Sequence, residues 1–331
     1  MGALTFTPSG IYCAAGDFFI DPWRPVDRAL ITHGHADHAR PGMGAYLATD
    51  LAAPVMRHRL GDIPLDTIRY GEVRQIGGAA VSFHPAGHVP GSAQIRVEVA
   101  GEVWVASGDY KVVDDGLSTP FEPVTCHHFI TESTFGLPVF RWQPQDVIAA
   151  ELNTWWAACA DAGKTAFLGC YALGKAQRLL TLLNPDQGPI LTHSAIENTN
   201  AVLRTQGLTL PDTVRADAEL TPKDHPGALV LCPPSAIGSA WARKFGPQET
   251  GFASGWMALR GIRRRRAGDR GFVISDHADW PGLLDAIRHT GAENIYVTHG
   301  YTDIFSRYLT ENGWSAQVVP TEFGGEEEDA A

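Results

Sequence analysis

The run HGHADH occupies residues 33–38 and directly follows the apolar stretch ALIT at residues 29–32. The apolar stretch predicts a short buried strand, because a glycine turn bounds it at Gly34. Alternate residues of an extended chain point the same way, so His33 and His35 can bind one cation together. The sequence therefore predicts a metal site at the end of a buried strand.

Asp37 and His38 complete the motif. If the chain turns into a helix after the strand, both side chains swing toward a second cation beside the first. Neutral imidazole suits zinc, manganese or iron, and the carboxylate favours harder metals at the second position. A purification tag is an ordinary alternative for clustered histidines, but this run is internal and contains an acidic residue. We therefore interpret the four side chains as metal ligands.

Composition restricts the class of protein. The chain has 331 residues, enough for one large domain or two ordinary ones. No apolar run approaches the roughly 20 residues of a membrane span, and the N-terminus has no basic start followed by an apolar core. The five cysteines are scattered and form no CxxC pair, which predicts free thiols and no cysteine zinc site. We expect a cytoplasmic protein without a membrane partner.

The formal net charge of −11 argues against a protein that coats nucleic acid by bulk attraction. An enzyme with a local basic channel remains compatible, because phosphate binding depends on the charge near the groove. One such basic stretch comprises Arg260, residues 263–266 and Arg270. We expect Arg264 and Arg265 to contact backbone phosphates, and solvated surface charge is the alternative.

The pattern of apolar stretches changes along the chain. To about residue 135, short apolar strands alternate with Gly/Pro turns. From about residue 140, strands alternate with helices. The expected strands lie at 165–168, 189–192 and 228–231, and helices begin near Gly174, Glu197 and Ala240. This alternation predicts an α/β fold with parallel strands covered by helices.

Three other strand ends carry ligand-type side chains. His88 lies in a turn between two glycines, Asp109 follows an apolar strand, and His299 follows another. The sequence Val-Thr-His-Gly around His299 echoes Ile-Thr-His-Gly at residues 31–34. Alone, each is an ordinary turn residue, but strand ends can hold distant ligands rigidly in one place. Together with the first motif, they predict a single metal centre.

In this order, the motifs resemble those of the metallo-β-lactamase superfamily. Its signature HxHxDH is met in full at residues 33–38. His88 matches the next metal histidine of that superfamily, and Asp109 matches the bridging aspartate. Asp21, in Phe-Ile-Asp-Pro, resembles the earlier aspartate that supports the site from a strand end.

The β-CASP nuclease branch of the superfamily adds an acidic residue and two late histidines, which Glu132, His277 and His299 match. Within this branch, three stretches most resemble the bacterial ligase-associated DNA-damage-response exonucleases, which are relatives of the Snm1/Artemis nucleases. They are residues 171–177, 254–257 and 275–280. This resemblance implies a metallo-β-lactamase αββα sandwich with an inserted α/β β-CASP domain. The sandwich would comprise residues 1–137 and 270–331, and the insert would comprise residues 138–269.

The resemblance also assigns ligands for two divalent metal ions, zinc or manganese. One ion would be bound by His33, His35 and His88, and the other by Asp37, His38 and His299, with Asp109 between them. Two such ions can activate a hydroxide that attacks the scissile phosphate and can stabilise the leaving oxygen. Asp37 and Asp109 would then be catalytic as well as metal-binding.

His277 would protonate the departing sugar oxygen or hydrogen-bond the scissile phosphate, because imidazole titrates near neutrality. Glu132 would orient His277 and favour its cationic form. Without the resemblance, a helix cap or a surface acid is the simpler interpretation of Glu132. Asp279 precedes Trp280-Pro281, which predicts a helix N-cap and not a catalytic acid.

Within the expected insert, residues 169–175 lie between a strand and a helix, where backbone N–H groups attract anions. The glycine spacing is not that of a P-loop. Lys175 and Arg178 are candidate phosphate contacts, and solvated helix charges are the alternative.

Together these residues imply a metal-dependent phosphodiesterase. The resemblance implies a DNA exonuclease that acts 5′→3′ on single-stranded or frayed ends in DNA repair, in a pathway shared with a DNA ligase and a helicase. The first alternative is a β-CASP ribonuclease that processes RNA, because residues that cleave a phosphodiester do not distinguish the two sugars. A small-molecule metallo-hydrolase and a non-enzymatic nucleic-acid binder are the others. The inserted region argues against the hydrolase, and the complete ligand set argues against the binder.

Overall fold

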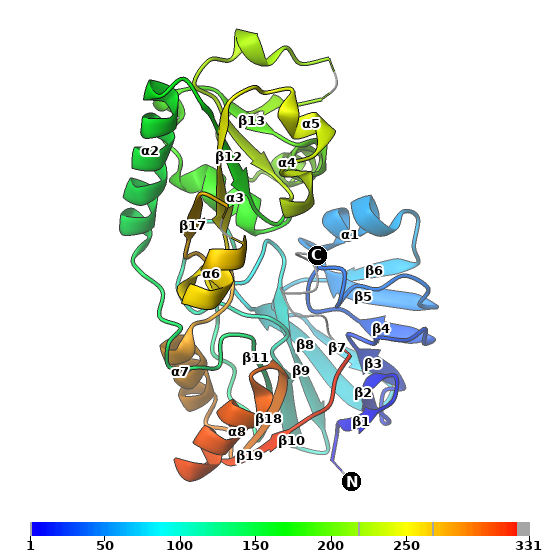
Figure 1. Cartoon of the computed structure of the whole chain (residues 1–331). Coiled ribbons are helices and arrows are strands. Elements are labelled where there is room, and N and C mark those ends of the chain that lie inside the picture. Colours follow the sequence, from blue (N-terminus) through cyan, green and yellow to red (C-terminus); the bar gives the residue numbers. More distant parts are fainter. Residues whose placement is uncertain (1, 218, 267, 323–331) are drawn as a thin grey trace. The chain divides into compact units, whose positions relative to one another are not determined.

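The structure, a computed structural model, describes residues 2–217, 219–266 and 268–322 (Figure 1). These residues form two compact units. The first unit comprises residues 2–138 and 277–322, and the second comprises residues 139–276. The first unit is therefore discontinuous in sequence, and the chain leaves it once and returns once.

Two sheets form the centre of the first unit. The first sheet has the order β1-β2-β3-β4-β5-β6 and is parallel from β3 onward. Its strands are β1 (Thr5–Thr7), β2 (Gly10–Cys13), β3 (Phe18–Ile20), β4 (Arg28–Leu30), β5 (Ala45–Thr49) and β6 (Leu65–Ile68). The second sheet has the order β19-β18-β11-β10-β9-β8-β7. Its strands are β7 (Val73–Ile76), β8 (Ala79–Pro85), β9 (Ala93–Val99), β10 (Glu102–Ala106), β11 (His128–Ser133), β18 (Asn294–Gly300) and β19 (Ser315–Val318).

The two sheets pack face to face, with helices on their outer faces. Side chains such as Phe18 and Leu30 from the first sheet share one buried core with Phe83 and Ile95 from the second. Helix α1 (Ala53–Leu60) covers the other face of the first sheet, and α7 (Trp280–Thr290) and α8 (Thr302–Glu311) cover the other face of the second. Period-two alternation in the strands supplies apolar side chains to both faces, as this helix–sheet–sheet–helix layering requires.

A third, wholly parallel sheet forms the second unit, in the order β14-β13-β15-β12-β16-β17. Its strands are β12 (Thr165–Gly169), β13 (Ile190–Thr192), β14 (Val214–Arg215), β15 (Leu229–Cys232), β16 (Gln248–Ala253) and β17 (Arg270–Phe272). Its helices are α2 (Gln145–Asp161), α3 (Lys175–Leu182), α4 (Ser194–Thr205), α5 (Ala240–Arg243) and α6 (Arg260–Arg266). Ala166 and Leu168 face a core that contains α2 and α3, whereas Phe167 faces a second core that contains α5. The sheet is thus buried on both faces, as parallel sheets are.

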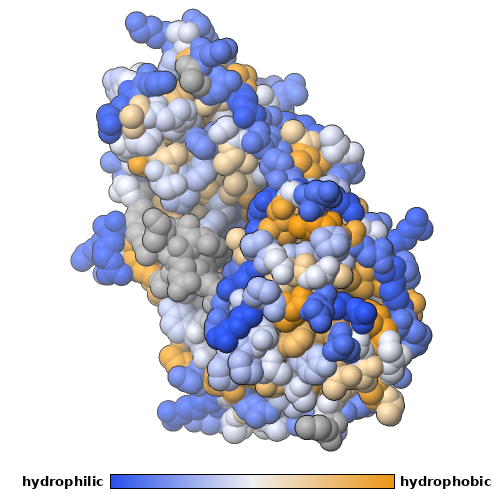
Figure 2. All heavy atoms as spheres, turned by 90° about the vertical axis from the view of Figure 1, so that its right-hand side faces the viewer, coloured by the Kyte–Doolittle hydropathy of each residue, from blue (hydrophilic) through white to orange (hydrophobic). Residues whose placement is uncertain are grey.

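These elements confirm the predicted α/β class, with parallel strands and covering helices in the second unit. Within the described residues, no helix has both the length and the apolar content needed to cross a membrane. Figure 2 shows hydrophilic and hydrophobic residues interspersed over the face in view. All five cysteines are free and buried, as expected from their spacing.

The direction of the strands brings the ligand-type residues of the first unit together. Strands β3 and β4 run in parallel, and so do β10, β11 and β18. Strand β8 is antiparallel to β9, which is antiparallel to β10, so β8 and β10 share one direction. The carboxyl ends of strands that share a direction lie at one edge of their sheet. Every candidate ligand lies at or just beyond such an end.

Candidate metal centre

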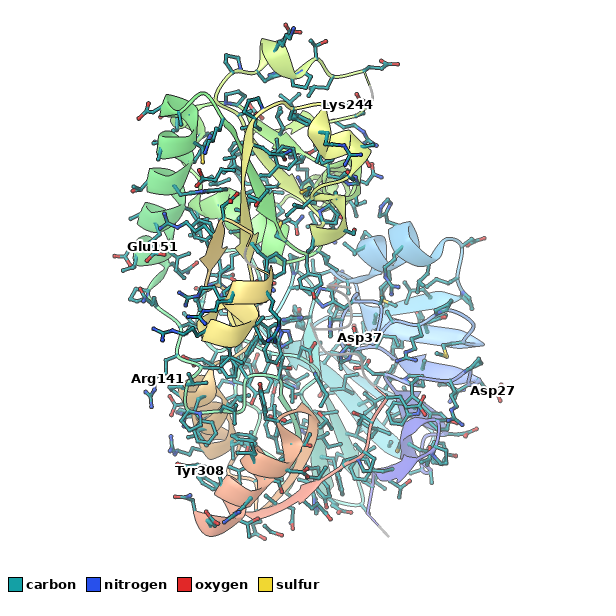
Figure 3. The ribbon with its side chains drawn as sticks, in the orientation of Figure 1. Asp27, Asp37, Arg141, Glu151, Lys244 and Tyr308 are labelled. Atoms are coloured by element: carbon teal, nitrogen blue, oxygen red, sulfur yellow. The ribbon has the colours of Figure 1, made fainter. Side chains whose placement is uncertain are left out.

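Residues 33–38 follow β4 in a tight turn. Figure 3 labels Asp27, which precedes this strand, and Asp37, which follows it. The helix considered for this segment does not form: a single turn is closed where the Ala39 N–H donates to the carbonyl of His35 at 2.9 Å. The turn alone brings Asp37 and His38 round to the side chain of His33.

Asp21 supports this turn from the end of β3. One carboxylate oxygen accepts a hydrogen bond from the backbone N–H of Thr32 at 2.8 Å. The other lies 2.5 Å from the Thr32 hydroxyl and 2.8 Å from Nδ1 of His38. Asp21 has a φ of 42°, an uncommon backbone conformation for a residue with a side chain. This contact with Nδ1 directs Nε2 of His38 toward the centre, as outer carboxylates do for metal-binding histidines.

His33, His35 and His88 form the first group of ligand atoms. Nδ1 of His35 lies 3.1 Å from Nε2 of His33 and 3.1 Å from Nε2 of His88. These separations are close to the roughly 3.3 Å between ligand atoms of a tetrahedral zinc site with Zn–N distances near 2.05 Å. A cation among the three nitrogens would use all three lone pairs, whereas hydrogen bonds between rings satisfy them only in part.

His88 is fixed by the turn between β8 and β9. The Ser92 hydroxyl accepts hydrogen bonds from the N–H groups of His88, at 3.1 Å, and Val89, at 3.2 Å. Gly87 has a φ of 73°, and a Cβ at that position would lie 2.2 Å from the carbonyl oxygen of Lys111. Only glycine fits there, so the flanking glycine noted in the sequence has a steric role in presenting His88.

Asp109, beyond the end of β10, is shared between the groups of ligands. Its Oδ2 lies 3.5 Å from His33 Nε2, 3.4 Å from His38 Nε2 and 3.8 Å from His88 Nε2. Its Oδ1 lies 2.9 Å from Nε2 of His299. Three sets of ligand atoms, each within 4.8 Å, contain this carboxylate: one with His33, His35 and His88, one with His38 and His299, and one with Glu132 and His277. A further set joins His33, Asp37 and His38. Asp109 is therefore placed where a bridging ligand would be.

Burial and neighbouring charges shift the titration of this cluster. Burial holds the pKa of His33 well below its usual value, with a further contribution from the nearby His38. Burial alone would lower the pKa of His38, but the carboxylates of Asp109, Asp37 and Asp21 raise it well above its usual value. Burial likewise opposes ionisation of Asp109, yet the imidazoles of His38 and His299 hold its pKa well below the usual range. A bound cation would compete with a proton for the imidazole of His38.

A second buried pair lies beside the cluster. Nδ1 of His277 is 2.9 and 2.8 Å from the two carboxylate oxygens of Glu132, in β11. Glu132 also accepts a hydrogen bond from the backbone N–H of Tyr110 at 2.8 Å. The ring of His277 packs against that of His88, with centroids 4.5 Å apart. Glu132 and His277, far apart in sequence, therefore meet next to the ligands.

The candidate phosphate contacts lie in the second unit, where two of them are buried and two are exposed. Lys175 and Arg178 are 0% and 3% exposed, and both face the carboxylate of Asp276. This corrects the expectation that they contact phosphates or are solvated, because a side chain this buried reaches neither. Arg264 and Arg265, in α6, are exposed.

Two arginines that sequence reasoning missed hold the motif loop. Arg59, from α1, donates to the carbonyl oxygens of Gly34, at 3.0 Å, and of His35 and Ala39. Arg40 donates to the carbonyl of Asp37 at 3.1 Å. Nothing in the local sequence distinguishes Arg59 from Arg57, two positions earlier in the same helix. In a helix, these carbonyl groups would accept hydrogen bonds from backbone N–H groups; here the two arginines donate to them instead.

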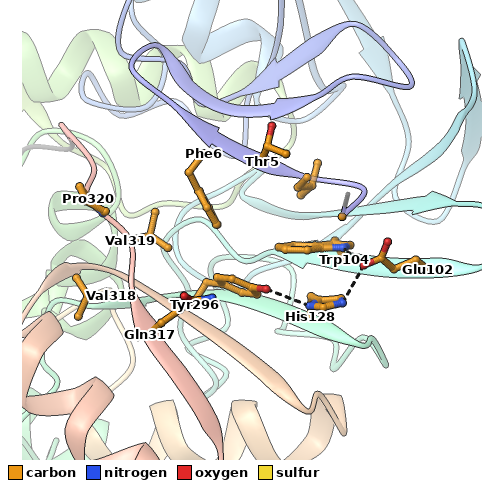
Figure 4. A pocket seen from close by; sticks show the side chains of 12 residues that line it. Thr5, Phe6, Glu102, Trp104, His128, Tyr296, Gln317, Val318, Val319 and Pro320 are labelled. Atoms are coloured by element: carbon orange, nitrogen blue, oxygen red, sulfur yellow. Dashed lines mark hydrogen bonds and ion pairs between the residues drawn. The ribbon is translucent and has the colours of Figure 1, made fainter.

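A hollow of about 500 Å³ lies elsewhere in the first unit (Figure 4). Its walls include Trp104, which stacks on His128 with ring centroids 4.1 Å apart, and Tyr296. His128 pairs with Glu102 at 2.9 Å. These two ionisable side chains already satisfy each other, and among the described residues they join none of the sets of three or more ligand atoms. Among the described residues, the sets of potential metal ligands all lie at the strand-end cluster.

The donor set fits divalent metal ions. It combines five imidazoles with two aspartates. Neutral imidazole with carboxylate is a usual ligand set for zinc or manganese. The residues present therefore suit the divalent metal ions that the sequence motif implies.

No protein-family profile matches the chain. A "Probable DNA ligase" of Opitutus terrae is 29% identical over 315 residues, which cover 94% of this chain and 30% of the ligase. Cleavage and polyadenylation specificity factor 73 of Drosophila melanogaster is 24% identical over 53% of this chain and 27% of its own length. An RNase J-like protein of Methanocaldococcus jannaschii is 25% identical over 49% of this chain and 44% of its own length. The chain thus spans less than half the length of these relatives.

A solved structure of a protein of unknown function from Enterococcus faecalis shares the fold. Its TM-score is 0.60 over 90% of this chain and 80% of that one, with 11% sequence identity. This likeness concerns the fold alone. The sequence relatives carry more, because they are homologues of this chain and its HxHxDH side chains meet in one cluster. These homologues are members of the β-CASP branch of the metallo-β-lactamase family.

Proposed function

We propose that this chain is a metal-dependent phosphodiesterase that degrades nucleic acid from an end. The observation that carries this proposal is the position of Asp109 between two groups of histidine and aspartate ligands. His33, His35 and His88 would bind one divalent ion, and Asp37, His38 and His299 the other. Such ions would lower the pKa of bound water and neutralise charge on the phosphate. We propose zinc or manganese, because both accept this mixed ligand set.

The residues beside the ligands supply the proton chemistry. Glu132 fixes His277 through Nδ1, so Nε2 is the nitrogen that would exchange a proton with substrate. As the bond between phosphorus and the sugar oxygen breaks, its electron pair goes to that oxygen, which takes the Nε2 proton. Glu132 balances the positive charge of the imidazolium before transfer. Burial of both side chains strengthens this pairing.

We propose DNA as the substrate, with 5′→3′ trimming of single-stranded or frayed ends during repair. The relative named as a probable DNA ligase matches 94% of the chain, whereas cleavage and polyadenylation factor 73 and the RNase J-like protein match 53% and 49%. A ligase-named protein that contains a counterpart of 94% of the chain supports a ligase as pathway partner. The proposed architecture is the αββα sandwich for the first unit and a β-CASP insert for the second. RNA processing remains the second candidate, because the RNA-related names occur among the same relatives.

Digestion of matched DNA and RNA strands tests the substrate. Each strand would carry a label at the 5′ or the 3′ end, and zinc or manganese would be supplied in turn. We expect DNA to be shortened progressively, with early release of the 5′ label. Faster loss of the RNA strand would instead establish the ribonuclease.

Variants of the motif loop test the metal assignment. Asp37→Ala and His38→Ala each remove one ligand, so cleavage should fall by at least the 10- to 100-fold typical of disturbed metal sites. Asp27→Ala is the matched control, because Asp27 is exposed and lies at the other end of β4. Circular dichroism would check that all three variants fold. Full activity in either ligand variant would contradict the two-metal centre.

A further inference from the structure

Strand β18 brings His299 to the metal centre through an irregularity in its pairing with β11, in the first unit. The register advances by two residues on β11, from residue 131 to 133, but by three on β18, from residue 297 to 300. Thr298 and His299 therefore lie opposite Glu132 alone. One extra residue in one of two paired strands is a β-bulge, which bends the strand and locally disrupts the ladder.

The bulge decides the direction in which His299 points. Before it, β18 alternates regularly: Ile295 and Val297 face the core that contains α7 and α8, and Tyr296 faces the core between the two sheets. Unbroken alternation would give His299 the direction of Val297, because side chains two residues apart share a face. The extra residue reverses this direction, and Nε2 of His299 lies 2.9 Å from Oδ1 of Asp109. The bulge therefore makes His299 part of the metal centre.

Two hydroxyl groups hold the bulge. The Ser133 Oγ lies 2.6 Å from the carbonyl oxygen of His299 and 3.0 Å from that of Thr298. The Thr298 hydroxyl donates in the other direction, to the carbonyl of Thr131 at 3.0 Å. Ser133 and Thr298 are 0% and 4% exposed, so these hydrogen bonds are shielded from water. Side-chain donors thus serve backbone carbonyls where the ladder is interrupted.

The backbone that follows His299 is tied to Ser133 as well. The N–H of Tyr301 donates to the carbonyl of Ser133 at 2.9 Å. Gly300, between them, has a φ of 87°, and a Cβ at that position would lie 2.2 Å from the same carbonyl oxygen. Only glycine allows the two strands to approach so closely. Ser133 therefore contacts the β18 segment at His299 itself and two residues later.

We propose that Ser133 is a positioning residue for the second metal ion: its hydroxyl fixes the bulge that turns the imidazole of His299 toward Asp109. The inference deepens the proposed function and rests on it, because His299 is given there as a ligand of that ion. Ser133 acts through the backbone carbonyl of His299 and is not itself a ligand. Loss of an outer contact of this kind typically lowers metal affinity about 10- to 100-fold.

Zinc binding to the full chain tests the proposal. Competition with a chromogenic chelator would give the number of bound ions and the affinity for each. For Ser133→Ala we expect the affinity for one ion to be unchanged and that for the other to fall about 10- to 100-fold. The unchanged ion is the one assigned to the turns after β4 and β8. His299→Ala, which removes the ligand itself, should weaken the other ion at least as much.

A double variant separates positioning from general stability. If Ser133 acts only through the imidazole of His299, adding Ser133→Ala to His299→Ala should lower the affinity for the second ion no further. Thr290→Ala is the matched control, because the Thr290 hydroxyl is also buried in the first unit and donates to a backbone carbonyl, that of Ile287, at 2.7 Å. Thermal melting would measure the stability of each variant. The control should lose stability and still bind both ions like the unmodified protein.

Unchanged zinc binding in Ser133→Ala, or additive losses in the double variant, would overturn the positioning role. If Ser133→Ala does not fold, Thr298→Val provides the same comparison, because it removes the other hydroxyl of the bulge and keeps a branched side chain of similar shape. Binding of both ions by Thr298→Val as tightly as by the unmodified protein would likewise overturn the role of the bulge.

Failure of the proposed function gives a different result. If His299→Ala binds both ions like the unmodified protein, His299 is not a ligand, and the second ion of the proposed function loses its support. Failure of the positioning role alone leaves the loss in His299→Ala intact. The two outcomes are therefore distinguishable in one set of titrations.

Discussion

At the scale of single residues, Asp21 connects the backbone of the motif to one of its ligands. Its carboxylate contacts the Thr32 N–H, the Thr32 hydroxyl and Nδ1 of His38. These three contacts fix both the start of the motif loop and the orientation of one imidazole. Among the described residues, Asp21 belongs to none of the sets of ligand atoms, yet it contacts His38, a member of the second group.

Asp21→Asn should therefore weaken metal binding while leaving every ligand in place. The amide can keep one or two of the contacts, but it lacks the charge that holds His38 in its orientation. We expect the affinity for zinc to fall about 10- to 100-fold. Competition with a chromogenic chelator would measure the affinity. Asp27→Asn, which changes an exposed acid, should bind zinc like the unmodified protein; equal affinities in the two variants would show that Asp21 has no such role.

The ligand residues could be predicted from sequence because their chemistry is compressed into short motifs. The spacing of the HxHxDH motif identifies His33, His35, Asp37 and His38 as ligands. The family resemblance adds His88, Asp109 and His299. Lys175 and Arg178 could not be placed correctly, because nothing local shows that Asp276, about 100 residues later, lies against them. Arg59 was missed for the same reason. A side chain that binds backbone carbonyls has no sequence pattern.

At the scale of elements, the start of α7 is one that the local sequence predicts correctly. Asp279 accepts a hydrogen bond from the N–H of Gly282 at 3.0 Å, and proline occupies the first turn. This confirms the predicted N-cap. The N-cap lies two residues after His277, so the cap also ends the segment that carries the imidazole.

Asp279→Ala should cost about 1 kcal/mol of unfolding free energy, as loss of an N-cap usually does. Urea denaturation would measure the change. Asp285→Ala, in the same helix, removes an exposed acid paired with Arg288 at 2.8 Å and should cost less than about 0.5 kcal/mol. Activity per folded molecule should be unchanged in both variants. A marked loss of activity in Asp279→Ala alone would instead give this acid a part in the reaction.

The expected elements that formed are those with strong local patterns. Strands β10, β12, β13, β15 and β18 lie where apolar runs predicted them. The helix considered after β4 did not form, because Asp21, Arg40 and Arg59 satisfy the polar groups of a turn there instead. Such tertiary hydrogen bonds override local propensity and cannot be read from a window of sequence.

At the scale of the whole molecule, one helix is basic although the chain as a whole is acidic. The chain carries a net charge of −11, yet α6 contains Arg260, Arg263, Arg264 and Arg265 within six residues. Arg263 is partly engaged, because it donates to the carbonyl of Met257 at 2.7 Å. Arg264 and Arg265 are exposed, which suits contact with a polyanion.

Replacing Arg264 and Arg265 by alanine should therefore weaken DNA binding and flatten its dependence on salt. Removing one arginine from a phosphate reduces the slope of log affinity against log salt by about 1, so a decrease of about 2 is expected for the pair. Fluorescence anisotropy with a labelled single strand, titrated at several salt concentrations, would measure the slope. The matched control is Arg288→Ala with Arg307→Ala, which removes two exposed arginines from the first unit and changes the net charge equally. If both double variants change the slope by the same amount, bulk charge accounts for binding and α6 has no specific role; a decrease confined to the α6 variant would mark this helix as part of the path that the nucleic acid follows.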